Sequence, residues 1–136
     1  MPCTQRVVVT YNKEKKPLSF ELQCSGKCDD GSNCQPKSET DDKTHTTREY
    51  CACQGGKGNE SKQCHIVLYT VKNKAGTKVV EQFFKCESDP AEKCPDGKKC
   101  SAVIVEHVPF DDEPTKYKER VFECGCQPEN EVWREK

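Results

Sequence analysis

The sequence contains few residues that can form a hydrophobic core. Val, Ile, Leu and Phe together account for 22 of its 136 residues, which is below the roughly 20% at which a chain buries too little apolar surface to fold by burial alone. No apolar run approaches the about 18 residues that a membrane-spanning helix needs, so we expect no membrane span. Cross-links must therefore replace part of the core.

An excess of charge of either sign is also absent. The chain has 22 basic and 23 acidic residues, and the balance holds locally, with eight of each sign in residues 1–54 and ten basic against eleven acidic in residues 64–126. Nucleic acids and anionic membranes are usually bound by clustered Lys and Arg. The composition therefore predicts no nucleic-acid partner.

Sequence motifs of catalysis are missing as well. There is no Gly-x-Ser-x-Gly, His-Glu-x-x-His, phosphate loop or Cys-x-x-Cys, and His45, His65 and His107 occupy unlike positions in the chain. The paired aspartates do not follow the alternating ligand pattern of a calcium loop. We therefore expect no catalytic residue, no cofactor and no enzymatic activity.

Cysteine, in contrast, is abundant and regularly placed. The twelve cysteines form two sets of six in the same order, which are Cys3, Cys24, Cys28, Cys34, Cys51, Cys53 and Cys64, Cys86, Cys94, Cys100, Cys124, Cys126. An even, repeated set in a short chain indicates a disulfide scaffold, which persists in oxidising compartments. The chain begins Met1-Pro2-Cys3 without a signal-peptide hydrophobic region, so we expect a secreted or cell-surface protein whose signal peptide has been removed.

The two cysteine sets divide the chain into repeats. Residues 1–54 form a first six-cysteine repeat and residues 64–128 a second, while residues 55–63 are a Gly-rich linker and residues 129–136 a charged C-terminal tail. Because this composition is typical of a flexible linker, we expect the repeats to fold as separate beads.

Alternating and β-branched segments predict four strands in each repeat. In the second repeat they lie at residues 65–71, 78–86, 101–108 and 117–126. In the first repeat three of them lie at residues 6–11, 18–24 and 46–53, and the remaining strand, between Cys34 and residue 46, is expected from its clearer counterpart at residues 101–108. Turns are indicated by Asn12-Lys13 and Asn73-Lys74 and by the shared Cys-x-Asp-Gly-x-x-Cys motif. The predicted fold is all-β, with two tandem small disulfide-stapled antiparallel domains of two hairpins each.

Hairpin geometry suggests a pairing of the cysteines. The midpoints between Cys3 and Cys24, Cys64 and Cys86, Cys34 and Cys51, and Cys100 and Cys124 fall in or beside predicted turns. The predicted bridges are therefore Cys3–Cys24, Cys34–Cys51, Cys64–Cys86 and Cys100–Cys124, with Cys28–Cys53 and Cys94–Cys126 by elimination. Directly opposed cysteines in a sheet are often too far apart to bond, so a swap in which Cys24 or Cys34 takes the other member of Cys51 and Cys53 stays open.

Three positions are candidates for contact or modification. Trp133 in the charged tail and Phe110 beside Asp111-Asp112 are candidate contact residues because interfaces favour aromatics, although Phe110 is expected to pack on its own hairpin. The triplet Asn59-Glu60-Ser61 is a candidate glycosylation site at Asn59.

These features together favour a secreted, non-enzymatic tandem-repeat protein. It acts as an extracellular binding or structural module, and its partner is a protein, an extracellular surface component, or a second copy joined through sheet edges. The alternatives are an inhibitor or toxin-like binder and a cysteine-rich metal-binding protein. Cys-x-Cys and His65 beside Cys64 offer soft ligands, but the spacing is not that of a zinc site, so no metal ligand is predicted.

Overall fold

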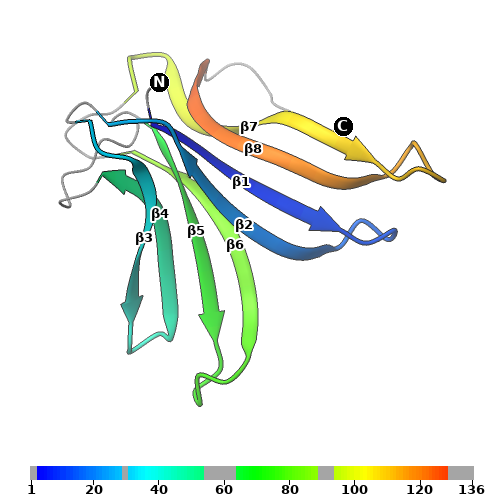
Figure 1. The fold of residues 1–136 in the computed structure, drawn as a ribbon, viewed down its shortest axis with the longest axis horizontal. Helices are drawn as coiled ribbons and strands as arrows, with labels where there is room; N and C mark the ends of the chain where they lie inside the picture. Colours follow the sequence, from blue (N-terminus) through cyan, green and yellow to red (C-terminus); the bar gives the residue numbers. More distant parts are fainter. Residues whose placement is uncertain (1–2, 29–30, 54–63, 89–93, 129–136) are drawn as a thin grey trace.

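The computed structural model describes residues 3–28, 31–53, 64–88 and 94–128 of the chain. Within these ranges the fold is all-β, as the sequence predicts (Figure 1). Its strands are β1 (Thr4–Tyr11), β2 (Pro17–Ser25), β3 (Cys34–Asp41), β4 (Thr46–Cys53), β5 (His65–Lys72), β6 (Val79–Glu87), β7 (Lys98–Pro109) and β8 (Tyr117–Pro128). The described residues contain no helix that is long and apolar enough to cross a membrane.

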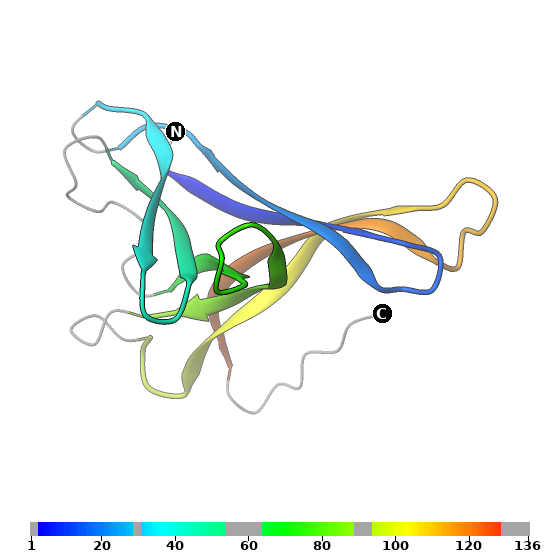
Figure 2. The ribbon, with the colours of Figure 1, turned by 90° about the horizontal axis from the view of Figure 1, so that it is seen from below.

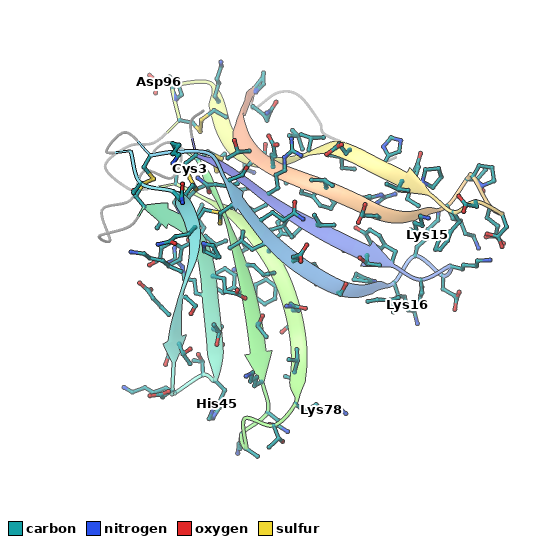
Figure 3. The ribbon with its side chains drawn as sticks, viewed as in Figure 1. Cys3, Lys15, Lys16, His45, Lys78 and Asp96 are labelled. Atoms are coloured by element: carbon teal, nitrogen blue, oxygen red, sulfur yellow. A yellow bond between two sulfur atoms is a disulfide. The ribbon has the colours of Figure 1, made fainter. Side chains whose placement is uncertain are left out.

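The strands form two four-stranded antiparallel sheets. Sheet 1 has the order β2-β1-β8-β7 and sheet 2 has the order β3-β4-β5-β6. The two sheets meet at one end, near Cys3 (Figure 3), and diverge from there, so that their hairpin tips point in different directions (Figures 1 and 2). Lys15 and Lys16 lie at the tip of sheet 1, whereas His45 and Lys78 lie at the tip of sheet 2 (Figure 3).

Asparagine side chains form the first turn of each repeat. The Asn12 Oδ1 atom accepts hydrogen bonds from the backbone N–H groups of Glu14 and Lys16 at 2.9 and 3.0 Å. In the second repeat the Asn73 Oδ1 atom accepts one from the N–H of Thr77 at 3.0 Å. The left-handed backbone position of this turn is occupied by Gly76, with φ of 71°. These turns place β1 against β2 and β5 against β6.

The repeats do not fold as separate beads, because each sheet combines one hairpin from each repeat. β1 pairs with β8 from Val7↔Phe122 to Thr10↔Glu119, and β4 pairs with β5 from Thr46↔Val71 to Tyr50↔Val67. A small β hairpin has two open edges and is marginally stable alone. Pairing between repeats closes one edge of every hairpin. In independent domains that edge would stay open.

One apolar core lies between the two sheets. Val7 and Val9 of β1, Ile66 and Leu68 of β5, and Phe122 of β8 are each at most 6% exposed and form a single cluster. The Phe84 ring of β6 lies 4.8 Å from the Phe122 ring across the sheets. The period-2 alternation of the strands thus supplies one buried face per sheet, and both repeats contribute to it.

All twelve cysteines are in disulfides, but four of the six predicted pairs are wrong. The structure has Cys28–Cys53 and Cys94–Cys126, as elimination predicts. In place of Cys3–Cys24, Cys34–Cys51, Cys64–Cys86 and Cys100–Cys124, it has Cys3–Cys34, Cys24–Cys51, Cys64–Cys100 and Cys86–Cys124. The bond of Cys24 to Cys51 agrees with the alternative in which Cys24 takes one member of the Cys51 and Cys53 pair, whereas Cys34 bonds to Cys3 and to neither of them.

The strand register explains the correction. In the β1–β2 ladder Gln5 faces Cys24, so Cys3 lies beyond the position opposite Cys24. The observed bridges instead connect the two hairpins of one repeat, which lie in different sheets, as Cys24 of β2 and Cys51 of β4 do. A backbone ladder already closes each hairpin, and the four bridges that differ from the prediction join sheet 1 to sheet 2. Cys28–Cys53 and Cys94–Cys126 instead connect the segments before β3 and β7 to β4 and β8.

Candidate binding face on the second sheet

Sheet 2 carries a row of aromatic and basic side chains on the face turned away from the core. Because Ile66 and Leu68 point into the core, the alternating residues of β5 and their partners across the sheet point outward. We call this the aromatic face, and it consists of Arg48, Tyr50, Tyr69, Phe83 and Lys85 with Glu39 and Glu87 beside them. It crosses all four strands of sheet 2.

The rings of the aromatic face are stacked and covered by cations. The Tyr69 and Phe83 rings lie 5.1 Å apart at an interplanar angle of 12°. The Lys85 Nζ atom lies 5.7 Å from the Tyr69 centroid and 5.6 Å from the Phe83 centroid, and the Arg48 guanidinium lies 5.0 Å from the Tyr50 centroid. These distances are within the range of cation–π attraction, so the rings and cations hold one another in place.

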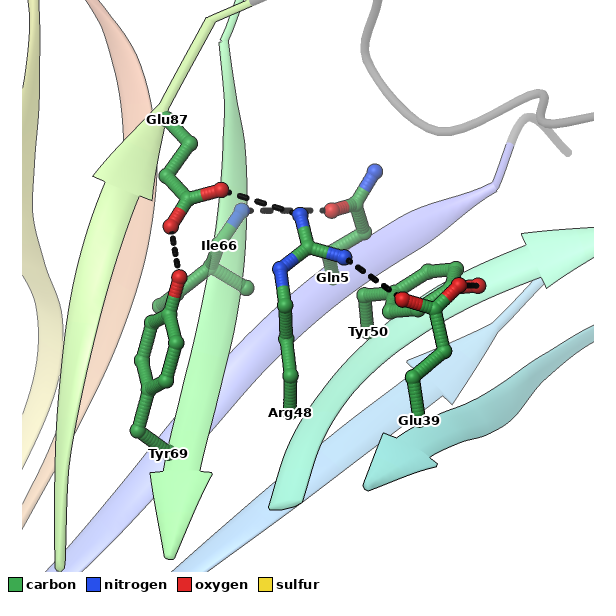
Figure 4. Close-up of polar contacts among 7 residues, drawn as sticks. All are labelled: Gln5, Glu39, Arg48, Tyr50, Ile66, Tyr69 and Glu87. Carbon is green, nitrogen blue, oxygen red and sulfur yellow. Dashed lines mark hydrogen bonds and ion pairs between the residues drawn. The ribbon is translucent and has the colours of Figure 1, made fainter. Parts of the chain in front are cut away.

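Two glutamates connect the aromatic face into one polar network (Figure 4). Arg48 forms ion pairs with Glu87 at 2.9 Å and with Glu39 at 3.8 Å. The Tyr50 hydroxyl donates to Glu39 at 3.0 Å, and the Tyr69 hydroxyl donates to Glu87. Arg48 is therefore the centre of a network that extends from β3 to β6.

The network shifts the pKa values of its members. Burial would raise the pKa of the Glu87 carboxyl, but the hydrogen bonds from Tyr69 and Arg48 outweigh burial and lower that pKa from its ordinary value. Burial and the hydrogen bond to Glu87 raise the pKa of the Tyr69 hydroxyl. At neutral pH the network therefore contains an ionised Glu87 that accepts hydrogen bonds from a neutral Tyr69 and a charged Arg48.

A buried valine anchors the aromatic face. Val67 points outward from β5, yet it is 0% exposed, and it stands between Tyr50 and Lys85 in the strand register. Long side chains such as Lys bury their methylene stems while the charged head stays in water. The face is therefore packed on both sides of β5, which keeps its rings in one arrangement.

Of the residues singled out from the sequence for contact, only Phe110 is described in the structure. It is half-buried in the turn between β7 and β8, where its N–H donates to the Lys116 carbonyl at 2.9 Å. The Lys13 Nζ atom from the neighbouring hairpin lies 5.7 Å from its ring centroid. The ring contact that the structure gives for Phe110 is thus with the β1–β2 hairpin and not with its own, whereas Trp133 and Asn59 lie outside the described residues.

The aromatic face is not among the sites that the sequence predicts. Its signal was present in the alternation of β5 and β6, where Tyr69 and Phe83 follow and precede the core-facing Leu68 and Phe84 and therefore point to the other face of the sheet. An aromatic residue at the outward position of a half-buried strand is the pattern that could have revealed it. Tyr50 and Arg48 come from the other repeat, so their addition to the row needs the pairing of β4 with β5.

Three cysteine sulfurs lie close together at the end where the sheets meet. The Sγ atoms of Cys24, Cys34 and Cys51 are all within 4.8 Å of one another. All three belong to disulfides, and the thiolate is the form of cysteine that binds metals. A metal could bind these sulfurs only after reduction of the two bridges.

Comparisons with known proteins leave the chain without a recognised relative. No family model matches the sequence, no curated protein matches it, and no solved structure matches the fold. Function therefore has to be argued from the disulfides, the sheet edges and the aromatic face.

Proposed function

We propose that this chain is a secreted, non-enzymatic binding module whose aromatic face contacts a protein or another extracellular surface component. The observation that carries the proposal is the row of Tyr50, Tyr69 and Phe83 with Arg48 and Lys85 on the outer face of sheet 2. Interfaces are enriched in Tyr, Phe and Arg, and residues that dominate binding are most often Trp, Tyr and Arg.

Rigidity supports this proposal. A surface that is already ordered loses less side-chain entropy on binding than a mobile one. The rings are held by stacking, by cations and by the Arg48–Glu87 ion pair. Six disulfides are consistent with an oxidising environment, and secretion is the route that places a mature chain there.

The experiment compares two matched double variants. Tyr69→Ala/Phe83→Ala removes the stacked pair, while Val8→Ala/Glu21→Ala changes the equivalent positions of sheet 1, counted from Cys3 and Cys24 as Tyr69 and Phe83 are from Cys64 and Cys86. The labelled native chain is screened against a panel of purified extracellular proteins and polysaccharides. We expect binding to at least one member, weakened at least tenfold by the first variant and unchanged by the second. Equal effects of both variants would contradict the proposal.

A second candidate function is structural, through pairing of sheet edges. β6 is an edge strand of sheet 2, and its Val79 and Val80 are 47% and 60% exposed. Open edges with exposed apolar residues can pair with another chain. Val80→Lys should then abolish any filaments seen by negative-stain imaging, whereas an aromatic-face variant should leave them intact.

Alkylation without reductant separates both functions from metal binding. A disulfide scaffold has twelve unreactive cysteines, so its intact mass should not change on alkylation. Free thiols together with a retained metal would favour the metal-binding alternative, for which the cluster of Cys24, Cys34 and Cys51 sulfurs is the candidate site.

A further inference from the structure

The two repeats are joined to each other only by non-covalent contacts and by residues 54–63. Three disulfides lie within residues 3–53 and three within residues 64–126. All twelve cysteines are used in these bridges, so none of them links one repeat to the other. Each repeat is thus a cross-linked unit that can part from its partner without breaking a disulfide.

The interface between the repeats resembles the interior of a single domain. It comprises the β1–β8 and β4–β5 ladders and the core cluster, to which the first repeat contributes Val7 and Val9 and the second contributes Ile66, Leu68 and Phe122. A repeat without its partner would expose these apolar side chains and the unpaired edges of two strands. It therefore needs a partner repeat, from its own chain or from another.

Four ion pairs between described residues cross the interface with the same polarity. The basic member comes from the first repeat and the acidic member from the second in each of the pairs Arg6–Glu123 at 2.7 Å, Arg6–Glu106 at 2.9 Å, Arg48–Glu87 at 2.9 Å and Lys13–Asp112. Two first repeats would bring like charges together at these positions, and so would two second repeats. The charges therefore favour a first repeat paired with a second repeat.

The connection between the repeats is longer than this pairing needs. β4 and β5 are antiparallel neighbours, which a two-residue turn can join. The chain has ten residues, 54–63, between Cys53 and Cys64, and at about 3.3–3.6 Å per extended residue these can span roughly 35 Å. This reach permits the second repeat to pair either with its own first repeat or with that of another molecule.

We propose that the partner of this interface can be a second copy of the chain. Two copies exchange repeats to form a closed dimer, in which each first repeat pairs with the second repeat of the other copy. Exchange of identical elements is a low-cost route to dimers because it creates no new interface. The exchange uses the inter-repeat surface, which includes the Arg48–Glu87 ion pair of the aromatic face, but it does not require that face to bind a ligand. Intramolecular pairing has an effective concentration on the order of mM, so the monomer dominates in dilute solution and the dimer forms on refolding at high concentration.

Charge reversal tests the exchange with the full-length chain. One variant is Arg6→Glu and the other is Glu106→Arg/Glu123→Arg, so each brings like charges together within its own monomer. Only an exchanged dimer of one copy of each restores attraction at both interfaces. The two variants, one of them isotope-labelled, are unfolded in guanidinium without reductant, mixed and refolded together at high concentration, and dimers are counted by native mass spectrometry.

We expect mixed dimers to exceed the sum of the two homodimers at least threefold, whereas random pairing gives equal numbers. The triple variant Arg6→Glu/Glu106→Arg/Glu123→Arg restores attraction within one chain and should be as monomeric as the native chain. Labelled and unlabelled native chains treated in the same way should form some mixed dimer even if a charge variant fails to fold. Monomers alone from the native mixture, or random pairing of the two folded variants, would overturn the proposal.

Discussion

Sheet 1 and sheet 2 have equivalent strands in equivalent positions, yet their outer faces differ. At the positions equivalent to Tyr69, Phe83 and Tyr50 of sheet 2, sheet 1 has Val8, Glu21 and Glu123, counted from the matching cysteines. Ion pairs of Arg6 with Glu106 and Glu123 connect β1, β7 and β8 of sheet 1, whereas sheet 2 carries the aromatic row. The duplicated scaffold tolerates either surface, because the cysteines and the inward residues determine the fold.

The largest effect is expected from the disulfides. Equivalent bridges of the two repeats should contribute equally to the free energy of unfolding. Replacing Cys24 and Cys51 together with alanine removes one bridge between the sheets, and replacing Cys86 and Cys124 removes its counterpart, at sequence separations of 27 and 38. Each should lower the free energy of unfolding by about 3.5–4 kcal/mol through loop entropy. Guanidinium denaturation without reductant measures both values, and a loss below about 1 kcal/mol for either pair would show that its bridge does not constrain the unfolded chain.

Core substitutions should show that both sheets depend on one shared core. Leu68→Ala in sheet 2 should cost about 3 kcal/mol, and Val7→Ala at the equivalent position of sheet 1 about 2 kcal/mol, because the larger side chain leaves the larger cavity. Both side chains are at most 2% exposed. Each variant should unfold in a single transition followed by fluorescence and by circular dichroism. Two separate transitions would instead indicate independent domains.

Arginine substitutions compare the two outer faces directly. Arg48→Ala should cost about 1.5 kcal/mol, because it removes two ion pairs and a cation–π contact. Arg6→Ala removes two ion pairs and should cost about 1 kcal/mol. Urea denaturation at low and at 1 M salt distinguishes them, since screening should reduce the Arg6 effect more. If Arg48→Ala and Arg6→Ala cost the same at low salt and also at 1 M salt, the stacking of Arg48 on Tyr50 contributes nothing to stability.

The smallest effect concerns acid stability. Because the pKa of Glu87 is lowered in the folded chain, its contribution is fully present above the pKa of an unfolded glutamate and is lost as the pH falls through the folded value. Glu87→Gln should therefore flatten the acid side of a stability profile measured by urea denaturation between neutral pH and roughly pH 3, by less than about 1 kcal/mol. Glu81→Gln, on the same face of β6 but outside the network of Arg48 and Tyr69, is the control, and equal flattening by both variants would contradict the role of the network.

Local chemistry allowed the hairpins to be predicted from the sequence. Asn12 and Asn73 mark turns whose side chains bond the backbone as expected, and the β-branched runs before them are β1 and β5. Strand β3 has no Val, Ile, Leu or aromatic residue, so its own residues give little strand signal. It is predicted because β7, at the equivalent place in the second repeat, has such residues. An edge strand can lack such residues because one of its sides is open to solvent.

Pairing between distant segments could not be predicted in the same way. The midpoint of Cys3 and Cys24 correctly locates a turn, but the bond partners depend on how the hairpins lie relative to one another. Whether β1 joins β8 or a strand of its own repeat is decided by side chains far apart in sequence, such as Val7 and Phe122. The aromatic face depends on the same long-range pairing, because Arg48 and Tyr69 meet only when β4 lies beside β5.

The overlapping disulfide loops also determine how the molecule responds to proteolysis. Every peptide bond from Cys3 to Cys53 lies inside at least one loop closed by a bridge, and the same holds from Cys64 to Cys126. A single cut in either stretch leaves one covalent molecule. A cut in residues 54–63 instead yields two chains, each with its three bridges intact, which remain together only through the ladders, the core and the ion pairs between them. An extracellular protease could thus turn a monomer into a non-covalent heterodimer by cutting between the repeats.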